Sequence, residues 1–598
     1  MEIEHDSQSL EYRQPQGAAP CGARITLRLR AGAGVRSAFV RFYDGSEKWF
    51  PMARESGGLF AAEIEMPPIP ILCWYDFRVE DEDGSLFAYG GPEDGMGGPG
   101  QLTDRPRAWQ ITVYDGAYDT PAFLREGVMY QIFPDRFARS GTERPRRAEI
   151  YFHTDWNEEP LLMPEGEDDN CARDFFGGDL KGIQQKLPYL AGLGVTVLYL
   201  NPVFMARSNH RYDTADYRRI DPLLGDNADF AALCQAAQAQ GIRILLDGVF
   251  SHTGEDSVYF NRLGRFDSVG ACQSPASPYY PWYTFTHYPD KYACWWGFHT
   301  LPEVNKNAES YRAFVLGPEG VARDWVGKGA SGWRLDVADE LPMNFLRDLR
   351  RAVKAESPQA ALLGEVWEDA SHKVAYGEMR CYCHGDTLDS VMNYPLRAAA
   401  LDFFTGKIDS AALCRLIRSQ QENYPAPFYY SLMNLAGSHD RPRAVNALCG
   451  RTFEELPPEK RRGMRLTAEE YRLGTRRYAL MMRLLCALPG IPCVYYGDER
   501  GMQGGPDPFC RGTFPWTGGD EALEAEIRAL LWQRRQSRAL QCFANLGGIC
   551  LKGGLIDFFV RPKLFLHGTE HRKKVRLVLQ MVAAVHAQQI RRLCNPGE

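Results

Sequence analysis

The sequence predicts an α/β protein built around a TIM (β/α)8 barrel, with an inserted subdomain after strand 3, an N-terminal β-sandwich and a short C-terminal β-type domain. Three features of the 598 residues support this prediction. The first 120 residues contain short alternating segments, the next 400 contain eight short apolar runs separated by helical stretches, and one connection between two runs exceeds 80 residues. A chain of this length is expected to form several domains.

The N-terminal region, residues 1–120, alternates apolar and polar side chains in short runs, for example at 23–29, 36–42 and 73–79. A period of two is typical of strands that are buried on one face. Clusters of Gly, Pro and Asp separate the runs and predict turns. We therefore expect a small antiparallel sandwich with its last strand near 109–114.

The region 121–535 alternates strand-like and helical patterns, which is typical of βαβ units. The predicted strands are 128–133, 195–200, 242–247, 332–336, 361–365, 388–392, 429–435 and 492–496. Eight such units close into a barrel whose functional residues lie where strands end and loops begin. A doubly wound sheet fits the same alternation, but no GxGxxG motif opens a helix after a strand.

Residues 253–310 are predicted to form the inserted subdomain, because a βα loop usually has about 2–6 residues. Its aromatic side chains gather at 279–285 and 295–298. They could form a small core for the insert, or a wall that stacks on the apolar faces of sugar rings. Residues 536–598 are predicted to form a truncated or atypical C-terminal domain, since too few strand patterns accompany the one at 554–561 to close a sandwich.

Composition excludes several classes of protein. Lys and Arg number 69 against 76 Asp and Glu, a balance that does not favour a nucleic-acid partner. No run of about 18 apolar residues predicts a membrane span, and the acidic start does not resemble a secretory signal. The 16 cysteines lie at irregular spacings and are typical of free thiols in a reducing compartment. We therefore expect a cytoplasmic protein without nucleic-acid or membrane partners.

Acidic residues end four of the predicted barrel strands: Asp247 ends strand 3, Asp336 strand 4 and Glu365 strand 5, and Asp440 follows strand 7. Arg334, His252 and His439 lie beside them in the sequence. Several acids at one rim repel one another. Active sites tolerate that repulsion, whereas stability alone would not favour it.

Two of these acids differ in their sequence surroundings. Arg334 and Asp336 are two residues apart on one strand, so both side chains point the same way, and a neighbouring Arg favours the ionised form of a carboxyl. Glu365 lies between 362–363 and 366–367, which are apolar, and apolar surroundings raise a carboxyl pKa. One ionised and one protonated carboxyl is the arrangement used in glycoside hydrolysis.

Four motifs carry a resemblance to a known family: 247–252 (DGVFSH), 332–336 (GWRLD), 365–367 (EVW) and 438–440 (SHD). Together and in this order they resemble the α-amylase family of glycoside hydrolases. The segments 208–217, 301–305 and 392–395 are similar to its neopullulanase, cyclomaltodextrinase and amylopullulanase branch. The resemblance covers about 20–540, and the N-terminal region resembles, more loosely, the starch-binding-type module of that branch.

The resemblance implies a role for each matching residue. Asp336 would be the nucleophile, Glu365 the general acid and base, and Asp440 the residue that stabilises the transition state. The residues implied in substrate binding are Arg334, His252, His439, Tyr212, Asp247, His210 and Trp367. A retaining mechanism would place the carboxyl groups of Asp336 and Glu365 ~5–5.5 Å apart.

The implied activity is hydrolysis of α-1,4 glucosidic bonds, with α-1,6 bonds as an open alternative, in maltodextrins, pullulan or cyclodextrins. An α-glucan transglycosylase is an alternative, because a sugar can replace water in the second step. A non-catalytic glucan-binding protein that works through its N-terminal sandwich is another. The resemblance also implies a homodimer formed through the N-terminal domain.

Many members of the family bind calcium, but the sequence departs from both common sites. Ser251 stands where the family motif has a ligating Asn. After the first predicted strand, Phe137 is followed by four arginines, at 139, 144, 146 and 147, which leave Asp179 as a lone possible acidic ligand. Calcium prefers carboxylate and carbonyl oxygens. We therefore expect neither a metal nor another cofactor.

Overall fold

Eight parallel strands form a barrel in the computed structural model of the protein, which describes residues 2–145, 147, 149–162, 172–537, 549–552 and 555–558. The strands neighbour one another in the order β26-β23-β22-β19-β16-β13-β28-β27, and a parallel bridge from Met392 to Met433 joins the two ends. They are β13 (Met129–Ile132), β16 (Val197–Leu200), β19 (Arg243–Gly248), β22 (Gly332–Leu335), β23 (Ala361–Gly364), β26 (Ser390–Val391), β27 (Met433–Leu435) and β28 (Ile491–Tyr495). Each coincides with a predicted run, so the predicted barrel is confirmed.

Helices connect most of the barrel strands, and one helix precedes the first strand and another follows the last. They are α1 (Ala122–Glu126), α2 (Pro134–Phe137), α3 (Leu180–Gln185), α4 (Leu187–Leu193), α5 (Asn227–Ala239), α6 (Glu309–Leu316), α7 (Val321–Gly327), α8 (Met343–Glu356), α9 (Tyr394–Phe404), α10 (Ser410–Asn423), α11 (Ala426–Tyr429), α12 (Ala444–Cys449), α13 (Ala468–Ala487) and α14 (Glu521–Gln536). Between β23 and β26 the chain instead forms a hairpin of β24 (Val374–Ala375) and β25 (Glu378–Met379). The strand–helix alternation is therefore interrupted at this one connection.

Alternate residues of each barrel strand face opposite sides, as a period of two requires. Met129, Val197 and Leu363 belong to one buried cluster inside the barrel. Their chain neighbours, such as Leu198, and Trp333 of β22 belong to the larger core between the strands and the helices. Since Trp333 faces the helices, Arg334 faces the barrel interior, as the spacing in the sequence predicts.

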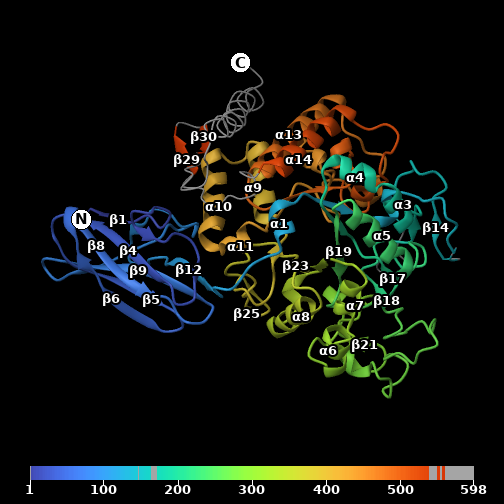
Figure 1. Ribbon diagram of the computed structural model, residues 1–598, viewed down its shortest axis with the longest axis horizontal. Coiled ribbons are helices and arrows are strands. Elements are labelled where there is room, and N and C mark those ends of the chain that lie inside the picture. The colour runs from blue at the N-terminus through green and yellow to red at the C-terminus, as the bar shows by residue number, and fades with distance from the viewer. Residues whose placement is uncertain are drawn as a thin grey trace.

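The N-terminal region forms two packed sheets (Figure 1, blue). One contains β1 (Ile3–Glu4), β2 (Arg13–Gln14), β4 (Arg24–Ala31), β7 (Ala53–Arg54) and β8 (Leu59–Glu65). The other contains β3 (Ala19–Pro20), β5 (Val35–Tyr43), β6 (Glu47–Pro51), β9 (Ile71–Asp81), β10 (Leu86–Gly90), β11 (Gln101–Leu102) and β12 (Trp109–Tyr114). Inward-facing residues of both sheets share one core, which is the arrangement of a sandwich.

The sandwich lies against the barrel beside α10 and α11 (Figure 1). Arg13 of β2 forms a 2.9 Å ion pair with Glu422 of α10, and the two side chains are 0% and 5% exposed. The hydroxyl of Thr112 in β12 donates to the backbone oxygen of Asn423 at 2.6 Å. Buried polar contacts therefore fix the orientation of the sandwich on its own barrel.

The long connection between β19 and β22 contains short elements as well as α6 and α7. These short elements are β20 (Phe285–His287), β21 (Lys291–Tyr292) and the 3-10 helices η2 (Tyr280–Trp282) and η3 (Trp295–Gly297). Trp282 and Tyr283 are buried, and the rings of Phe260 and Tyr283 lie 4.8 Å apart in an edge-to-face arrangement. Trp295 and Trp296 instead line a cleft at the barrel rim. The aromatic residues of the insert therefore form a small core in one part and line the cleft in another.

Smaller pairs of strands complete the described chain: β14 (Tyr151–Phe152) with β15 (Asp174–Phe175), β17 (Phe204–Ala206) with β18 (Thr214–Ile220), and β29 (Ile549–Lys552) with β30 (Leu555–Phe558). The last hairpin falls within the predicted C-terminal region 536–598, most of which lies outside the described residues. Of the helices that the structure describes, none has both the length and the apolar character needed to span a bilayer. The cysteines recorded in the described ranges are free thiols.

Candidate active site

A cleft of about 640 Å³ opens where the barrel strands end, which is within the usual size range of ligand pockets. Most of the predicted site residues line it: Asp336, Glu365, Asp440, His252, His439, Tyr212, His210 and Trp367. The other two are buried and contact residues that line the cleft. Arg334 pairs with Asp336, and Asp247 accepts a hydrogen bond from Tyr212. The structure therefore brings together every residue that the sequence motifs indicate.

Arg334 is the centre of the carboxyl cluster. Its Nη1 donates to Asp247 Oδ1 at 2.7 Å and to Asp336 Oδ1 at 3.0 Å. Its Nη2 lies 2.8 Å from Glu365 Oε2. The same Glu365 oxygen also accepts the backbone N–H of Val337 at 2.9 Å. One guanidinium therefore holds three buried carboxyl groups, which come from three neighbouring strand ends.

This sharing corrects one expectation from the sequence. Burial raises the pKa of Glu365, as its apolar neighbours predict, although Arg334 opposes the shift. Burial also raises the pKa of Asp336 well above its usual range. Arg334 opposes that shift, while Glu365, Asp247 and Asp440 add to it. The prediction that Arg334 specifically favours an ionised Asp336 was thus incomplete, because the same cation is divided among several buried acids.

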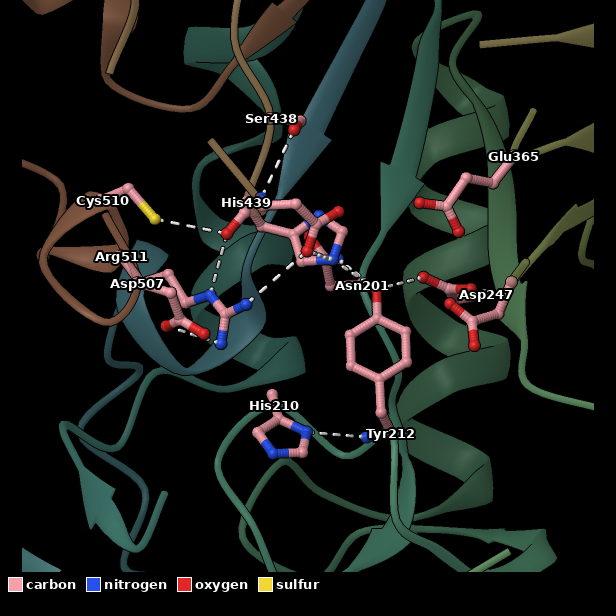
Figure 2. Close-up of polar contacts among 12 residues, drawn as sticks. Asn201, His210, Tyr212, Asp247, Glu365, Ser438, His439, Asp507, Cys510 and Arg511 are labelled. Carbon is pink, nitrogen blue, oxygen red and sulfur yellow. Dashed lines mark hydrogen bonds and ion pairs between the residues drawn. The ribbon is translucent and has the colours of Figure 1, made fainter. Parts of the chain in front are cut away.

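Tyr212 connects the acidic cluster to the histidines (Figure 2). Its hydroxyl donates to Asp247 Oδ2 at 2.9 Å, accepts from Asn201 Nδ2 at 3.0 Å and lies 2.6 Å from His439 Nε2. The rings of Tyr212 and His439 are parallel within 8°, with centroids 5.4 Å apart. Gln131 Nε2 lies 2.9 Å from His439 Nδ1, which leaves the Nε2 side of that ring toward the cleft. The network fixes both rings before any ligand arrives.

Two histidines that line the cleft each have a ring nitrogen without a hydrogen-bond partner among the described residues. His210 Nδ1 accepts the backbone N–H of Tyr212 at 3.1 Å, and His252 Nδ1 lies 2.9 Å from the hydroxyl of Ser251. Among the residues that the structure describes, neither His210 Nε2 nor His252 Nε2 has a hydrogen-bond partner, although both atoms are buried. Since buried polar atoms are normally paired, these nitrogens are suited to binding the hydroxyl groups of a ligand.

Asp440 lies at the outer part of this network, with Oδ1 3.1 Å from His439 Nε2 and 3.7 Å from Arg511 Nη2. Arg511 also donates from Nε to the backbone oxygen of His439 at 3.0 Å and pairs with Asp507 at 2.9 Å (Figure 2).

Sequence reasoning missed Asp507 and Arg511, which follow the eighth strand. It also missed Asn201, although a polar residue directly after strand 2 carries the same positional signal as the acids.

Trp367 forms an aromatic wall of the cleft. Its ring stacks on Tyr394 with centroids 3.8 Å apart and planes within 8°. The guanidinium of Arg441 lies 4.4 Å from the Trp367 ring centre. Tyr394 and Arg441 therefore cover the two faces of the Trp367 ring and hold the ring in one orientation at the edge of the cleft.

The segments that hold calcium in the family do not fit that ion here. Asp179 caps α3 by accepting the Gly182 N–H at 2.6 Å, and its other oxygen lies 3.3 Å from the Arg144 guanidinium. Arg144 also reaches Asp229 at 3.4 Å. A guanidinium beside the candidate ligand repels a divalent cation. Within the described ranges, no group of three His, Cys, Asp or Glu side chains could hold a metal ion.

Comparisons with known proteins identify similar sequences and structures. A family model described as "Alpha amylase, catalytic domain" matches residues 131–509. An amylopullulanase of Thermoanaerobacterium saccharolyticum is 37% identical over 90% of this chain and 45% of its own length. A cyclomaltodextrinase of Geobacillus thermopakistaniensis (strain MAS1) is 34% identical over 71% of this chain and 64% of its own. The solved structure of the type III pullulan hydrolase from Thermococcus kodakarensis is 27% identical, with a TM-score of 0.61 over 90% of this chain and 89% of that one. The chain therefore spans less than half the length of the amylopullulanase.

Proposed function

The chain belongs to the α-amylase family of catalytic domains, and on this basis we propose that it is a retaining α-glucan hydrolase that cleaves α-1,4 glucosidic bonds. The observation that carries the proposal is the shared guanidinium. Arg334 contacts Asp336 and Glu365 through different terminal nitrogens, at 3.0 Å and 2.8 Å. Two carboxyl groups held close together at the floor of a cleft are what double displacement requires.

In the proposed first step, a carboxylate oxygen of Asp336 attacks the anomeric carbon of the bound glucose unit. The bond from that carbon to the glycosidic oxygen breaks, and Glu365 donates its proton to the departing oxygen. The product is a glucosyl ester on Asp336. In the second step Glu365 takes a proton from water, the water oxygen attacks the anomeric carbon, and the Asp336 carboxylate leaves.

The other residues would support these steps without forming or breaking covalent bonds. Asp440 would hold ring hydroxyls and stabilise positive charge on the sugar, and Arg334 would orient Asp336. His252 and His439 would donate hydrogen bonds to hydroxyls of the same sugar, and His210 would contribute to substrate binding beside them. Tyr212 would stack on the face of that sugar, and Asp247 would hold Tyr212 and Arg334 in place.

The proposed substrates are maltodextrins, pullulan or cyclodextrins, in agreement with the names of the matched amylopullulanase, cyclomaltodextrinase and pullulan hydrolase. Hydrolysis of α-1,6 bonds is a second proposed activity, which the name amylopullulanase favours. Pullulan distinguishes the two bond types, because panose as product indicates α-1,4 cleavage and maltotriose indicates α-1,6 cleavage.

A cytoplasmic location and a homodimer also belong to the proposal. The free cysteines of the described chain support a reducing compartment. Tyr43 and Trp49, which are both exposed on β5 and β6 of the sandwich, support association through the N-terminal domain. Light scattering of the purified protein would test the dimer, and a monomer at all concentrations would contradict it.

Replacing Asp336 by Ala tests the catalytic assignment. The variant should lose nearly all turnover of maltodextrin while it still binds maltodextrin in a calorimetric titration, because only the nucleophile is removed. Unchanged hydrolysis by Asp336→Ala would overturn the site assignment. Absence of turnover in the unmodified protein, together with binding, would instead favour a non-catalytic glucan-binding protein.

A further inference from the structure

Two exposed aromatic residues from different loops meet on one carboxylate at the rim of the cleft. Trp296 in η3 of the insert donates from Nε1 to Glu340 Oε1 at 2.9 Å. Tyr376 at the tip of the β24–β25 hairpin donates from its hydroxyl to the same oxygen at 3.1 Å. Both rings line the cleft, although they are 71% and 69% exposed. Large aromatic residues so exposed commonly mark binding surfaces.

The backbone of both residues is in the left-handed region. Trp296 has a φ of 48° and is followed by Gly297 at 87°, and Tyr376 has a φ of 52° and is followed by Gly377 at 75°. A bulky residue with positive φ is uncommon, and a two-residue hairpin turn of this kind usually begins with Asn or Asp. Backbone strain of this kind gathers at ligand clamps and active sites. Burial does not explain the strain, because both side chains are mostly exposed.

A series of rings connects Trp296 to the catalytic floor. Buried His252 lies 5.3 Å from Trp295, and Trp295 stacks on Trp296 with centroids 4.9 Å apart and planes within 7°. The rings become more exposed from His252 to Trp296. A glucan that leaves the catalytic floor in this direction therefore meets apolar ring surfaces continuously.

Glu340 places this cluster on one side of the bond to be cut. It ends the 3-10 helix η4 (Ala338–Glu340), which begins directly after Asp336 and Val337. The N–H of Val337 donates to Glu365, and Tyr376 belongs to the loop that follows Glu365. The proposed acid gives its proton to the departing oxygen. The cluster is therefore tied to the segment that contacts the proposed acid, and the leaving sugar would be bound beside that acid.

We propose that Trp296, Tyr376 and Glu340 form a clamp for the leaving-group side of the substrate. The two rings hold α-linked glucose units beyond the bond to be cut, and the Glu340 carboxylate fixes both rings by accepting a hydrogen bond from each. This inference rests on the proposed function and assigns the residues that select the leaving sugar. Aromatic faces suit this task, because they contact the apolar faces of sugar rings and lose little conformational freedom on binding.

The test compares a substrate that has leaving-side sugars with one that has none. Maltohexaose contains glucose units on both sides of the bond, whereas α-maltosyl fluoride releases only a fluoride ion. We expect Trp296→Ala and Tyr376→Ala to lower kcat/KM for maltohexaose at least tenfold more than kcat/KM for the fluoride, mainly through a higher KM. Tyr376→Phe keeps the ring but loses the hydrogen bond to Glu340, so its effect should lie between those of the unmodified protein and Tyr376→Ala.

Tyr151→Ala provides the matched control, because Tyr151 is also exposed but does not line the cleft. It should leave both values unchanged. Equal losses on the two substrates in the Ala variants would overturn the clamp, since a residue that only supports the fold affects both equally. No loss on either substrate would overturn it too. An unmodified protein inactive on α-maltosyl fluoride would overturn the proposed function itself, and the clamp with it.

Discussion

Nη2 of Arg334 lies 2.8 Å from Oε2 of Glu365, while Nη1 donates to Asp336 at 3.0 Å and to Asp247 at 2.7 Å. The proposed acid and nucleophile therefore share one buried cation. Neither carboxyl can change its charge without changing the field at the other. The catalytic properties of both should consequently depend on a residue that itself forms no bond to the substrate.

We expect Arg334→Lys to lower kcat/KM on maltodextrin by about 100-fold or more, because an ammonium group cannot reproduce a planar fork that reaches three carboxyls. The lysine would compensate the negative charge of Asp336 less well than Arg334 does, so the pKa of Asp336 would rise further. Since Asp336 must be ionised to attack, the acid limb of the pH profile should move to higher pH. A pH profile of kcat/KM measures this shift, and an acid limb at its original position would contradict it. Arg24→Lys, at an exposed position on the sandwich, is the control.

His252 should make the protein less stable as the pH falls below 6.5. Burial lowers the pKa of His252 from 6.5 to about 3. Between these values the unfolded chain binds a proton that the folded protein does not bind, so stability decreases as the pH falls through this range. In His252→Gln the dependence of unfolding free energy on pH should decrease by up to about 1.4 kcal/mol per pH unit.

Denaturant unfolding at roughly pH 4.5 to 6.5, which lies between the two pKa values of His252, measures this dependence. Exposed His287→Gln is the control and should retain the slope of the unmodified protein. A His252→Gln variant with an unaltered slope would show that this imidazole titrates in the folded protein as it does in the unfolded chain.

Chelation of calcium should leave the Tm unchanged. Arg144 occupies the position beside Asp179, and its guanidinium already compensates that carboxylate. We expect Arg144→Ser to lower the stability by about 1–3 kcal/mol, because the hydrogen bonds of Asp179 to a charged partner are lost. Thermal unfolding with and without EDTA measures both effects. A fall in the Tm of the unmodified protein on adding EDTA would contradict the prediction.

Glu422→Gln should destabilise the contact between the sandwich and the barrel. The change leaves Arg13 buried without its ionised partner, and breaking a buried pair in this way costs about 3–5 kcal/mol. Glu63→Gln breaks an exposed pair with Arg24 and should cost only about 0–1 kcal/mol. Denaturant unfolding of both variants gives the comparison, and similar small losses would show that the buried pair does not hold the domains together.

The barrel and most of its site residues could be predicted from the sequence because both depend on local spacing. A period of two predicts that Arg334 on β22 and Asp336 directly after it point the same way, and parallel strands bring their carboxyl ends to one rim. The acids that end four strands therefore had to gather. Asn201 obeys the same rule, but a neutral amide adds no charge repulsion at the rim, so its sequence position alone does not distinguish it from a structural residue.

The remaining features depend on distances between residues that are far apart in the chain. No local pattern shows that one guanidinium serves three carboxyls, that Arg511 returns from the last loop to His439, or that Trp296 and Tyr376 meet on Glu340. Spacing determines which face a side chain occupies. Loop closure and packing determine which faces come within hydrogen-bond distance. For this protein, only the tertiary structure shows that three carboxyls share Arg334 and that two aromatic rings share Glu340.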